Sequence, residues 1–234
     1  MNKQILYLSK WINDYCKKTH TKGIVVGISG GIDSAVVANI ASLNKSLKVI
    51  GVWMNINNSK LDFKCVELLK KQHQFKIIDI DLTSTFNSLK KLIKIKSKLT
   101  LSNLKARLRM ATLYSVANEN TLLVAGTGNA DELYMGYFTK YGDGACDILP
   151  IANLTKSEVK LFAEELKVPQ IIIDRPPSAS LFEGQTDEKE MGVTYKEIDD
   201  FLNNKKISNE SRSIIKSYHS KNLHKQNLPV KPIF

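Results

Sequence analysis

The chain has 234 residues, of which 43% are hydrophobic and 24% charged, a composition typical of a folded globular domain rather than a disordered or fibrous chain. Its net charge is +11, from 34 lysines and arginines against 23 acidic residues, but only four of the basic residues are arginines. Because arginine is the side chain suited to bidentate contacts with nucleic acids, we interpret the excess as a solvated lysine surface and expect no nucleic-acid partner.

No segment of the sequence has the character of a membrane anchor. No run of apolar residues exceeds four, whereas a membrane span needs about 20, and the first residues lack the apolar core of a signal peptide. The cysteines are odd in number, scattered and without a Cys-x-x-Cys spacing, which argues against a disulfide framework and a zinc site: Cys16, Cys65 and Cys146. We therefore expect a cytoplasmic protein with no membrane partner.

The first half of the chain alternates between helical and strand patterns. Apolar residues recur at helical spacing over residues 2–18, and a β-branched run bounded by glycines at residues 23–28 is typical of a buried strand. A glycine loop then leads into a small-residue helix at residues 35–43. Further elements are expected as strands at 48–54, 75–82 and 121–126 and as helices at 60–74 and 101–119.

This order of elements predicts an α/β fold. Strands that alternate with helices of this length form a doubly wound, mostly parallel sheet with helices on both faces, as in Rossmann-like proteins. The sequence has no internal repeat and no low-complexity linker, so residues 1–234 are expected to form a single domain.

The regular alternation stops after residue 127. Residues 134–150 are rich in glycine, and residues 176–192 form a second irregular stretch. Long loops of this kind inside a compact domain are often binding loops. Helical patterns return at 156–166, 195–202 and 208–218.

The glycine loop after the first strand suits a phosphate group. Ser29-Gly30-Gly31-Ile32-Asp33-Ser34 would present backbone N–H groups and a helix N-terminus to an anion. Its spacing matches neither the lysine-containing loop of common nucleotide triphosphatases nor the dinucleotide fingerprint. Asp33 stands where that lysine would be, and a carboxylate beside phosphates needs a cation between them, so the loop predicts bound Mg2+.

The loop resembles the S-G-G-x-D-S loop of the ATP pyrophosphatases, which split ATP between its α and β phosphates. Within that group, the second half of the chain resembles the NAD synthetase family in the order and spacing of its motifs, over about residues 20–230. The strings that carry this likeness include Asn103-Leu104-Lys105-Ala106-Arg107-Leu108-Arg109-Met110, Gly126-Thr127-Gly128-Asn129, Thr139-Lys140-Tyr141-Gly142-Asp143-Gly144, Gly184-Gln185-Thr186-Asp187-Glu188 and Gly192-Val193-Thr194-Tyr195. The resemblance implies an adenine nucleotide alpha hydrolase-like fold.

The family resemblance also implies a ligase that makes NAD+ in two steps. The nicotinate carboxylate of deamido-NAD+ attacks the α-phosphate of ATP to give an adenylate and pyrophosphate, and ammonia then displaces AMP to form the amide. ATP is the implied co-substrate, Mg2+ the implied metal and a homodimer the implied assembly. An amidotransferase domain would need hundreds of further residues, so we expect free ammonia, or ammonia from a separate glutaminase, as the nitrogen donor.

Site residues follow from the same resemblance, position by position. Asp33 and Glu132 match carboxylates that hold Mg2+, and Asp143 and Lys156 are the catalytic candidates. The ATP site is expected to comprise Gly27, Ile28, Ser29, Gly30, Gly31, Ile32, Asp33, Ser34, Thr127, Lys156 and Ser178. The deamido-NAD+ site is expected to comprise Arg107, Lys140, Asp147, His224 and Lys225. For Asp143 two roles stay open: a carboxylate that steers ammonium and accepts its proton, or a turn aspartate that caps its own backbone.

Two other functions stay open at the level of the sequence. Five lysines between residues 90 and 98 would suit a tRNA-modifying ATP pyrophosphatase, although they equally suit a solvated surface, and no cysteine lies in the candidate site. A non-catalytic nucleotide-binding protein would leave the motifs of the second half unexplained. At Asn129 and Asp131 the chain departs from a related T-D-H-x-x-E form, so no histidine base is available there.

Overall fold

The computed structural model describes residues 2–72, 75–177 and 186–232, and these residues contain one parallel sheet in the strand order β3-β2-β1-β4. The strands are β1 (Gly23–Gly27), β2 (Lys48–Asn55), β3 (Lys76–Asp81) and β4 (Leu123–Ala125). Val25 of β1 is aligned with Ile50 of β2 on one side and with Val124 of β4 on the other. The expected α/β fold with a parallel sheet is confirmed.

Helices connect these strands and make up the second half of the described chain. The helices before the last strand are α1 (Lys3–Lys18), α2 (Ile32–Ser42), α3 (Lys60–Gln72), α4 (Thr83–Ile93) and α5 (Lys98–Asn120). The elements after it are α6 (Ala130–Met135), α7 (Lys156–Glu165), α8 (Gln170–Ile173), α9 (Asp187–Met191), α10 (Tyr195–Leu202), α11 (Asn209–Asn222) and the 3-10 helix η1 (Leu223–Lys225).

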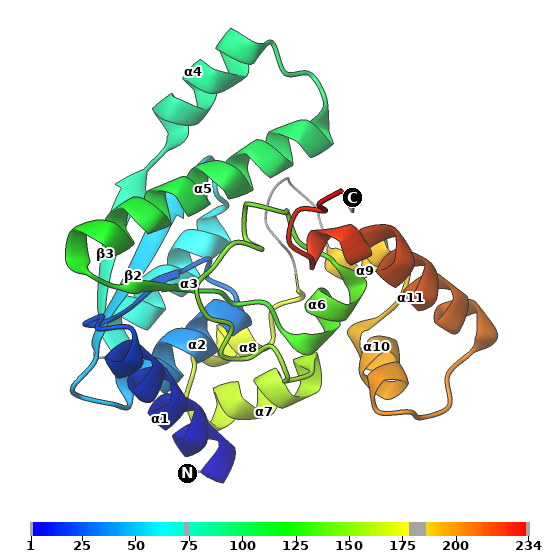
Figure 1. The fold of residues 1–234 in the computed structure, drawn as a ribbon, viewed down its shortest axis with the longest axis horizontal. Coiled ribbons are helices and arrows are strands. Elements are labelled where there is room, and N and C mark those ends of the chain that lie inside the picture. Colours follow the sequence, from blue (N-terminus) through cyan, green and yellow to red (C-terminus); the bar gives the residue numbers. More distant parts are fainter. Residues whose placement is uncertain (1, 73–74, 178–185, 233–234) are drawn as a thin grey trace.

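The sheet is buried on both faces because alternate residues of its strands enter different cores. Ile24 and Val26 of β1 pack in one core with residues of α1, α2, α3 and α7, whereas Val25 packs in the other core with residues of α4 and α5. Figure 1 shows α5 and α4 on one side of the strands and α1 and α7 on the other. The helices on both faces that the sequence predicts are therefore present.

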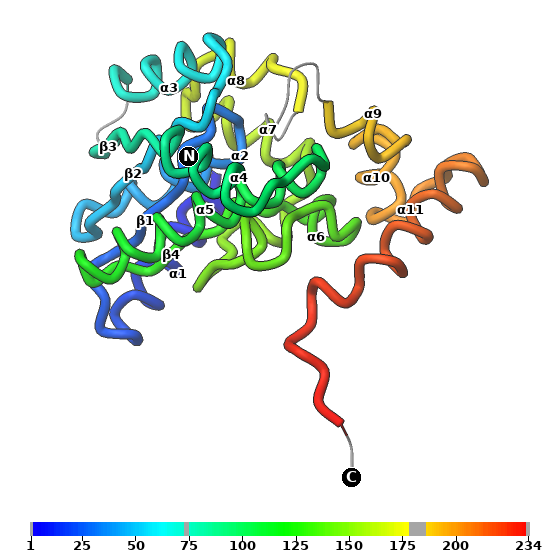
Figure 2. The backbone as a smooth tube through the Cα atoms, turned by 90° about the horizontal axis from the view of Figure 1, so that it is seen from above, coloured from blue at the N-terminus to red at the C-terminus, as the bar shows by residue number. Residues whose placement is uncertain are grey.

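A third apolar cluster lies outside the sheet and joins α6 to the C-terminal helices. Met135 of α6, Met191 of α9, Ile198 of α10 and Ile215 of α11 are buried together in it. Figure 2 shows the chain leaving this cluster after α11 and running away from the body of the molecule. The last described residues thus contribute exposed surface, including Val230 at 94% exposure.

Some helices of the structure were not predicted from the sequence, or have different bounds. Residues 83–93 form α4, which was not among the predicted elements although its apolar residues Phe86, Leu89 and Ile93 recur at helical spacing, and only Phe86 of that helix is buried. The irregular stretch predicted at 176–192 contains α9, and the glycine-rich region beginning at 134 overlaps the end of α6. The helix expected to start at residue 35 starts at Ile32, so Asp33 and Ser34 belong to its first turn. In the described residues, none of the helices combines the length and apolar character that crossing a bilayer requires.

The strand order creates a crevice at the carboxyl ends of β1 and β4. From β1 the chain proceeds through α2 to β2 on one side, whereas β4 lies on the opposite side of β1. The connections that leave β1 and β4 therefore diverge, and ligands of open α/β sheets bind at such a point. Residues 27–34 and residues 126–132 follow these two strands and meet there.

Candidate active site

A cavity of about 770 Å³ opens at this crevice, within the range of small-molecule sites. Its lining includes residues of the glycine loop and of the segment after β4, among them Ser29, Asp33, Thr127 and Glu132. Lys156, at the start of α7, also lines it. The residues that the sequence predicts for ATP and Mg2+ thus line one cavity, except Gly30, which belongs to the same loop but is absent from the lining, and Ser178, which lies outside the described residues.

The glycine loop presents a helix N-terminus to this cavity. Gly31 precedes the first turn of α2 and makes no side-chain cap. Within the loop the N–H of Gly31 donates to Ser29 Oγ at 3.1 Å and that of Ser29 to Ser34 Oγ at 3.3 Å, so the N–H groups of the first helical turn are the ones that an anion would meet. Gly30 has a φ of +79°, and a Cβ atom there would lie 3.0 Å from the Asp62 backbone oxygen. Gly30 is therefore required both by its backbone conformation and by the close approach of the α3 segment.

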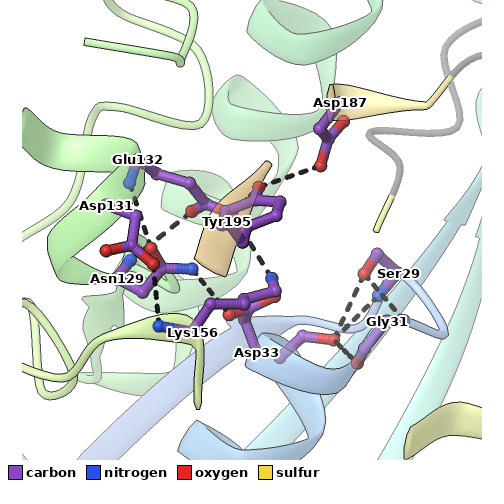
Figure 3. A network of polar contacts seen from close by, with 10 residues as sticks. Ser29, Gly31, Asp33, Asn129, Asp131, Glu132, Lys156, Asp187 and Tyr195 are labelled. Atoms are coloured by element: carbon purple, nitrogen blue, oxygen red, sulfur yellow. Dashed lines mark hydrogen bonds and ion pairs between the residues drawn. The ribbon is translucent and has the colours of Figure 1, made fainter. Parts of the chain in front are cut away.

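Lys156 lies between the two carboxylates expected to hold a metal. Its Nζ is 2.6 Å from Asp33 Oδ2 and 3.7 Å from Glu132 Oε1, as Figure 3 shows. The three side chains are 11%, 17% and 20% exposed, in the order Lys156, Asp33 and Glu132. Burial opposes the charge of Lys156, but the two carboxylates outweigh it and raise the pKa of the ammonium group. Lys156 is therefore a permanent cation at the phosphate loop.

For Glu132, in contrast, the surroundings disfavour the charged form of the side chain. Burial, and then repulsion by Asp33, raise the pKa of its carboxyl group. Its Oε2 accepts the backbone N–H of Asn129 at 3.4 Å, while Asn129 caps α6 by accepting the N–H of Glu132 at 3.0 Å. This capping box fixes Glu132 at the crevice, so the position expected after β4 is held by local hydrogen bonds.

Two residues of this cluster have no role assigned by the sequence. The Asn129 side chain donates to Asp33 Oδ1 at 2.9 Å, so the residue found in place of a histidine base orients a carboxylate. The Tyr195 hydroxyl donates to Asp187 at 3.1 Å and lies 3.4 Å from Glu132, while Lys156 Nζ lies 4.9 Å from the centre of its ring. Tyr195 thus links the acids to the lysine (Figure 3).

Asp131 and Asp199 form a second pair of acids behind this cluster. Asp131 accepts the N–H of Lys156 at 2.8 Å, and Asp199 accepts that of Ser157 at 3.1 Å, so both carboxyl groups cap the start of α7. Burial, and then the neighbouring Asp199, raise the pKa of Asp131. Both Oδ1 atoms lack a hydrogen-bond partner among the described residues.

Four of the five residues expected to bind deamido-NAD+ lie close together, and one of them, Lys225, lines the cavity. Arg107 donates to the backbone oxygen of Lys140 at 3.3 Å, and Lys140 Nζ donates to that of His224 at 2.6 Å. Lys225 lines the cavity and donates to the backbone of Gly136 and Phe138. The segment 136–140 is therefore tied to η1 by lysine side chains.

Asp147 lies apart from this group. Its carboxylate accepts the N–H of Val124 at 2.7 Å and the hydroxyl of Tyr114 at 3.2 Å, next to the backbone of β4. It is not among the residues that line the cavity within this chain. Its expected contact with deamido-NAD+ stays a prediction.

Asp143 stands at the cavity lining and also closes its own turn. Its Oδ1 accepts the backbone N–H of Thr139 at 3.1 Å, as a turn aspartate does. The same side chain is open to the cavity. The turn role is therefore present in the structure, and the contact with ammonium stays a prediction.

Comparisons with known proteins show the family to which the chain is similar. The model of the NAD synthase family matches residues 4–229. An NH(3)-dependent NAD(+) synthetase of Mycoplasma genitalium is 50% identical, with 98% of this chain and 94% of the relative covered, and one of Mycoplasmopsis pulmonis is 48% identical, with 97% and 89% covered. Among solved structures, an NMN synthetase from Francisella tularensis has a TM-score of 0.94 and 40% identity over 99% of this chain and 98% of its own. An NH3-dependent NAD synthetase from Campylobacter jejuni has a TM-score of 0.84 and 28% identity, with both chains fully covered.

The matched segment contains the glycine loop, the carboxylate and lysine cluster and Lys225 of the cavity lining. The chain belongs to the NAD synthase family.

Proposed function

We propose that this chain makes NAD+ from deamido-NAD+, ATP and ammonia, with release of AMP and pyrophosphate. The observation that carries the proposal is the cavity itself, in a chain of the NAD synthase family. The cavity is lined by the glycine loop and Lys156 and also by Lys225 and Asp143. A nucleoside triphosphate would fit beside the first group, and a second nucleotide with a carboxylate would fit beside the second.

The reaction requires neutralisation of charge more than proton transfer. The nicotinate carboxylate attacks the α-phosphorus of ATP, the bond to pyrophosphate breaks, and an acyl adenylate results. Ammonia then adds to the carbonyl carbon, loses a proton, and AMP leaves with the oxygen that came from the carboxylate. The chain contributes the helix N-terminus of α2 and the ammonium group of Lys156, both fixed before substrate binds, to offset the charge of the polyphosphate.

Asp33 and Glu132 are proposed to hold Mg2+. Their donor set fits this ion because Mg2+ usually takes one or two protein carboxylates and completes its shell with phosphate oxygens and water. Burial, and then repulsion by Asp33, raise the pKa of Glu132, and a bound cation would offset this repulsion together with Lys156. When bound, Mg2+ would neutralise charge on the phosphates.

We further propose a homodimer in which both copies line the dinucleotide site. Support comes from exposed apolar side chains on neighbouring helices, among them Leu92 and Ile93 of α4 and Leu99 of α5, at 77%, 61% and 71% exposure. The extended C-terminal segment adds Leu228 and Val230 (Figure 2). A second copy would cover such surface. In such a dimer Asp147 of one copy would contact the dinucleotide bound by the other.

The two other functions are less well supported. The family match favours neither tRNA modification nor nucleotide binding without catalysis. The lysines between residues 90 and 98 stay unassigned surface in this proposal.

The test is AMP release from ATP by the purified chain with Mg2+ and ammonium. Deamido-NAD+, nicotinate mononucleotide and bulk tRNA serve as separate acceptors, the second because a solved relative is an NMN synthetase. We expect AMP and NAD+ in equal amounts with deamido-NAD+. Release that responds only to tRNA, or only to the mononucleotide, would contradict the proposed substrate, and glutamine working as well as ammonium would contradict the proposed donor.

A further inference from the structure

Arg109 is a half-buried cation of the cavity wall to which neither the sequence motifs nor the proposed function assigns a role. It extends from α5 and lines the cavity. Its Nε donates to the backbone oxygen of Met54, at the end of β2, at 3.3 Å, and one terminal nitrogen donates to Asn58 Oδ1 at 3.0 Å. These contacts hold the guanidinium group at the carboxyl edge of the sheet.

The hydrogen bonds of Arg109 use neutral acceptors and leave most of its donors for another partner. A guanidinium group has five N–H donors, and the two contacts above engage two of them. Arg109 forms no ion pair with a carboxylate of residues 2–72, 75–177 or 186–232. Asn58, which Arg109 contacts, donates to Asp62 at 3.3 Å, and Asp62 itself is paired with Arg175 at 2.5 Å.

A charge in this position is costly without a counter-ion. Burial lowers the pKa of Arg109, and the more distant Asp62 and Asp143 only partly offset the effect. Buried charges in proteins are normally paired, because the lost hydration exceeds what neutral hydrogen bonds return. An arginine kept charged in a cavity wall therefore indicates an anion among the ligands of that cavity.

The neighbourhood of Arg109 identifies the class of anion. Strand β2 lies beside β1, whose carboxyl end carries the glycine loop, and Gly27 and Ile28 line the same cavity as Arg109. Arg107 lies two residues earlier on α5, is exposed and contacts Lys140, so the two arginines serve different parts of the site, as positions i and i+2 of a helix do. The fork of donors on Arg109 matches the oxygens of a phosphate.

We propose that Arg109 binds a phosphate oxyanion of a bound nucleotide. The inference rests on the proposed function for the identity of the nucleotides, which are ATP and deamido-NAD+. Both carry phosphates, and the experiment distinguishes them.

The test compares the full-length chain with Arg109→Gln and Arg109→Lys. Arg212→Gln is the matched control, because Arg212 is an exposed arginine of α11 that packs over Phe201 and is absent from the cavity lining. Calorimetric titration measures the Kd for ATP and, separately, for deamido-NAD+, in the presence of Mg2+. The urea midpoint of each ligand-free variant measures folding.

We expect Arg109→Gln to raise the Kd of one nucleotide at least tenfold, Arg109→Lys to raise it less, and Arg212→Gln to leave it unchanged. The urea midpoint of Arg109→Gln should stay near that of the wild type, because the lost hydrogen bonds are offset by the loss of an unpaired, half-buried charge. The affected nucleotide is the one whose phosphate Arg109 contacts.

Two results would overturn the assignment. Unchanged affinity for both nucleotides would show that Arg109 binds neither, and a lowered midpoint with equal loss of both affinities would show that it only supports β2 and α3. A wild-type chain that binds ATP but does not amidate deamido-NAD+ would instead contradict the proposed function, and the ATP arm would still test Arg109.

Discussion

Replacement of Lys156 by methionine tests two effects of this lysine. One is its ion pairing with Asp33 and Glu132, and the other is its competition with Mg2+ for the same carboxylates. The change removes the cation that lies 2.6 Å from Asp33 and 3.7 Å from Glu132, and keeps most of the side-chain volume. The two carboxylates then face each other without compensation. Removal of one partner of a buried ion pair costs about 3–5 kcal/mol. Because these side chains are 11–20% exposed, we expect the lower end, about 3 kcal/mol.

Urea unfolding of the ligand-free protein measures this cost, and the same titration with Mg2+ tests the metal proposal. Mg2+ at about 100 times its Kd would restore about 2.7 kcal/mol in the variant, and it would stabilise the wild type less, because Lys156 competes for the carboxylates. Lys196→Met is the control: Lys196 is 82% exposed in its pair with Asp200, so we expect no measurable change. Equal stability of Lys156→Met and wild type without Mg2+ would refute the electrostatic reasoning. An unfolding free energy of Lys156→Met that does not change on addition of Mg2+ would refute the metal site.

Two further predictions address the same site, and a third concerns a cysteine outside the cavity lining. Asp33→Asn and Glu132→Gln should each abolish turnover with far-UV circular dichroism unchanged, and full activity of either variant would remove that residue from the metal site. Tyr195→Phe loses the hydroxyl contacts with two acids, and since a hydrogen bond to a charged group contributes about 1.5–3 kcal/mol, kcat should fall at least tenfold; a kcat equal to that of the wild type would mean that the hydroxyl does not position the cluster. Burial raises the pKa of Cys146 from 9.0 to about 11, so at pH 8 its alkylation by iodoacetamide should be about a hundredfold slower in the native than in the unfolded chain, and equal rates would show a reactive thiol.

The parts of the site that could be predicted from the sequence are those encoded in a short string. The glycine loop with Asp33 is recognisable because a buried strand, two glycines and a helix start occur within a few residues. Its place in the crevice follows from the parallel sheet, which the alternation of elements also predicts. Helix α4 was missed although its apolar residues Phe86, Leu89 and Ile93 recur at helical spacing, and only Phe86 of that helix is buried in the structure.

The rest depends on contacts between distant parts of the chain. Tyr195 lies in a motif that resembles the family, but its hydroxyl acquires a role only because α10 packs beside α6 and brings it to Glu132, 63 residues earlier. Asn129 carried a partial signal, since it replaces a histidine of a related form, yet its bond to Asp33 spans 96 residues. From the sequence, Arg109 is a helical residue with no assigned role. Its place in the cavity wall depends on its contacts with β2 and with Asn58. No local pattern specifies such meetings.

The central claim is that the nicotinate carboxylate attacks the α-phosphate of ATP and that ammonia then displaces AMP. The most direct measurement uses deamido-NAD+ with an ¹⁸O-labelled nicotinate carboxylate, ATP, Mg2+ and ammonium, followed by mass spectrometry of the products. We predict one ¹⁸O atom in AMP, one retained in the amide of NAD+, and none in pyrophosphate. Unlabelled AMP, or ADP with label in inorganic phosphate, would contradict the adenylate mechanism.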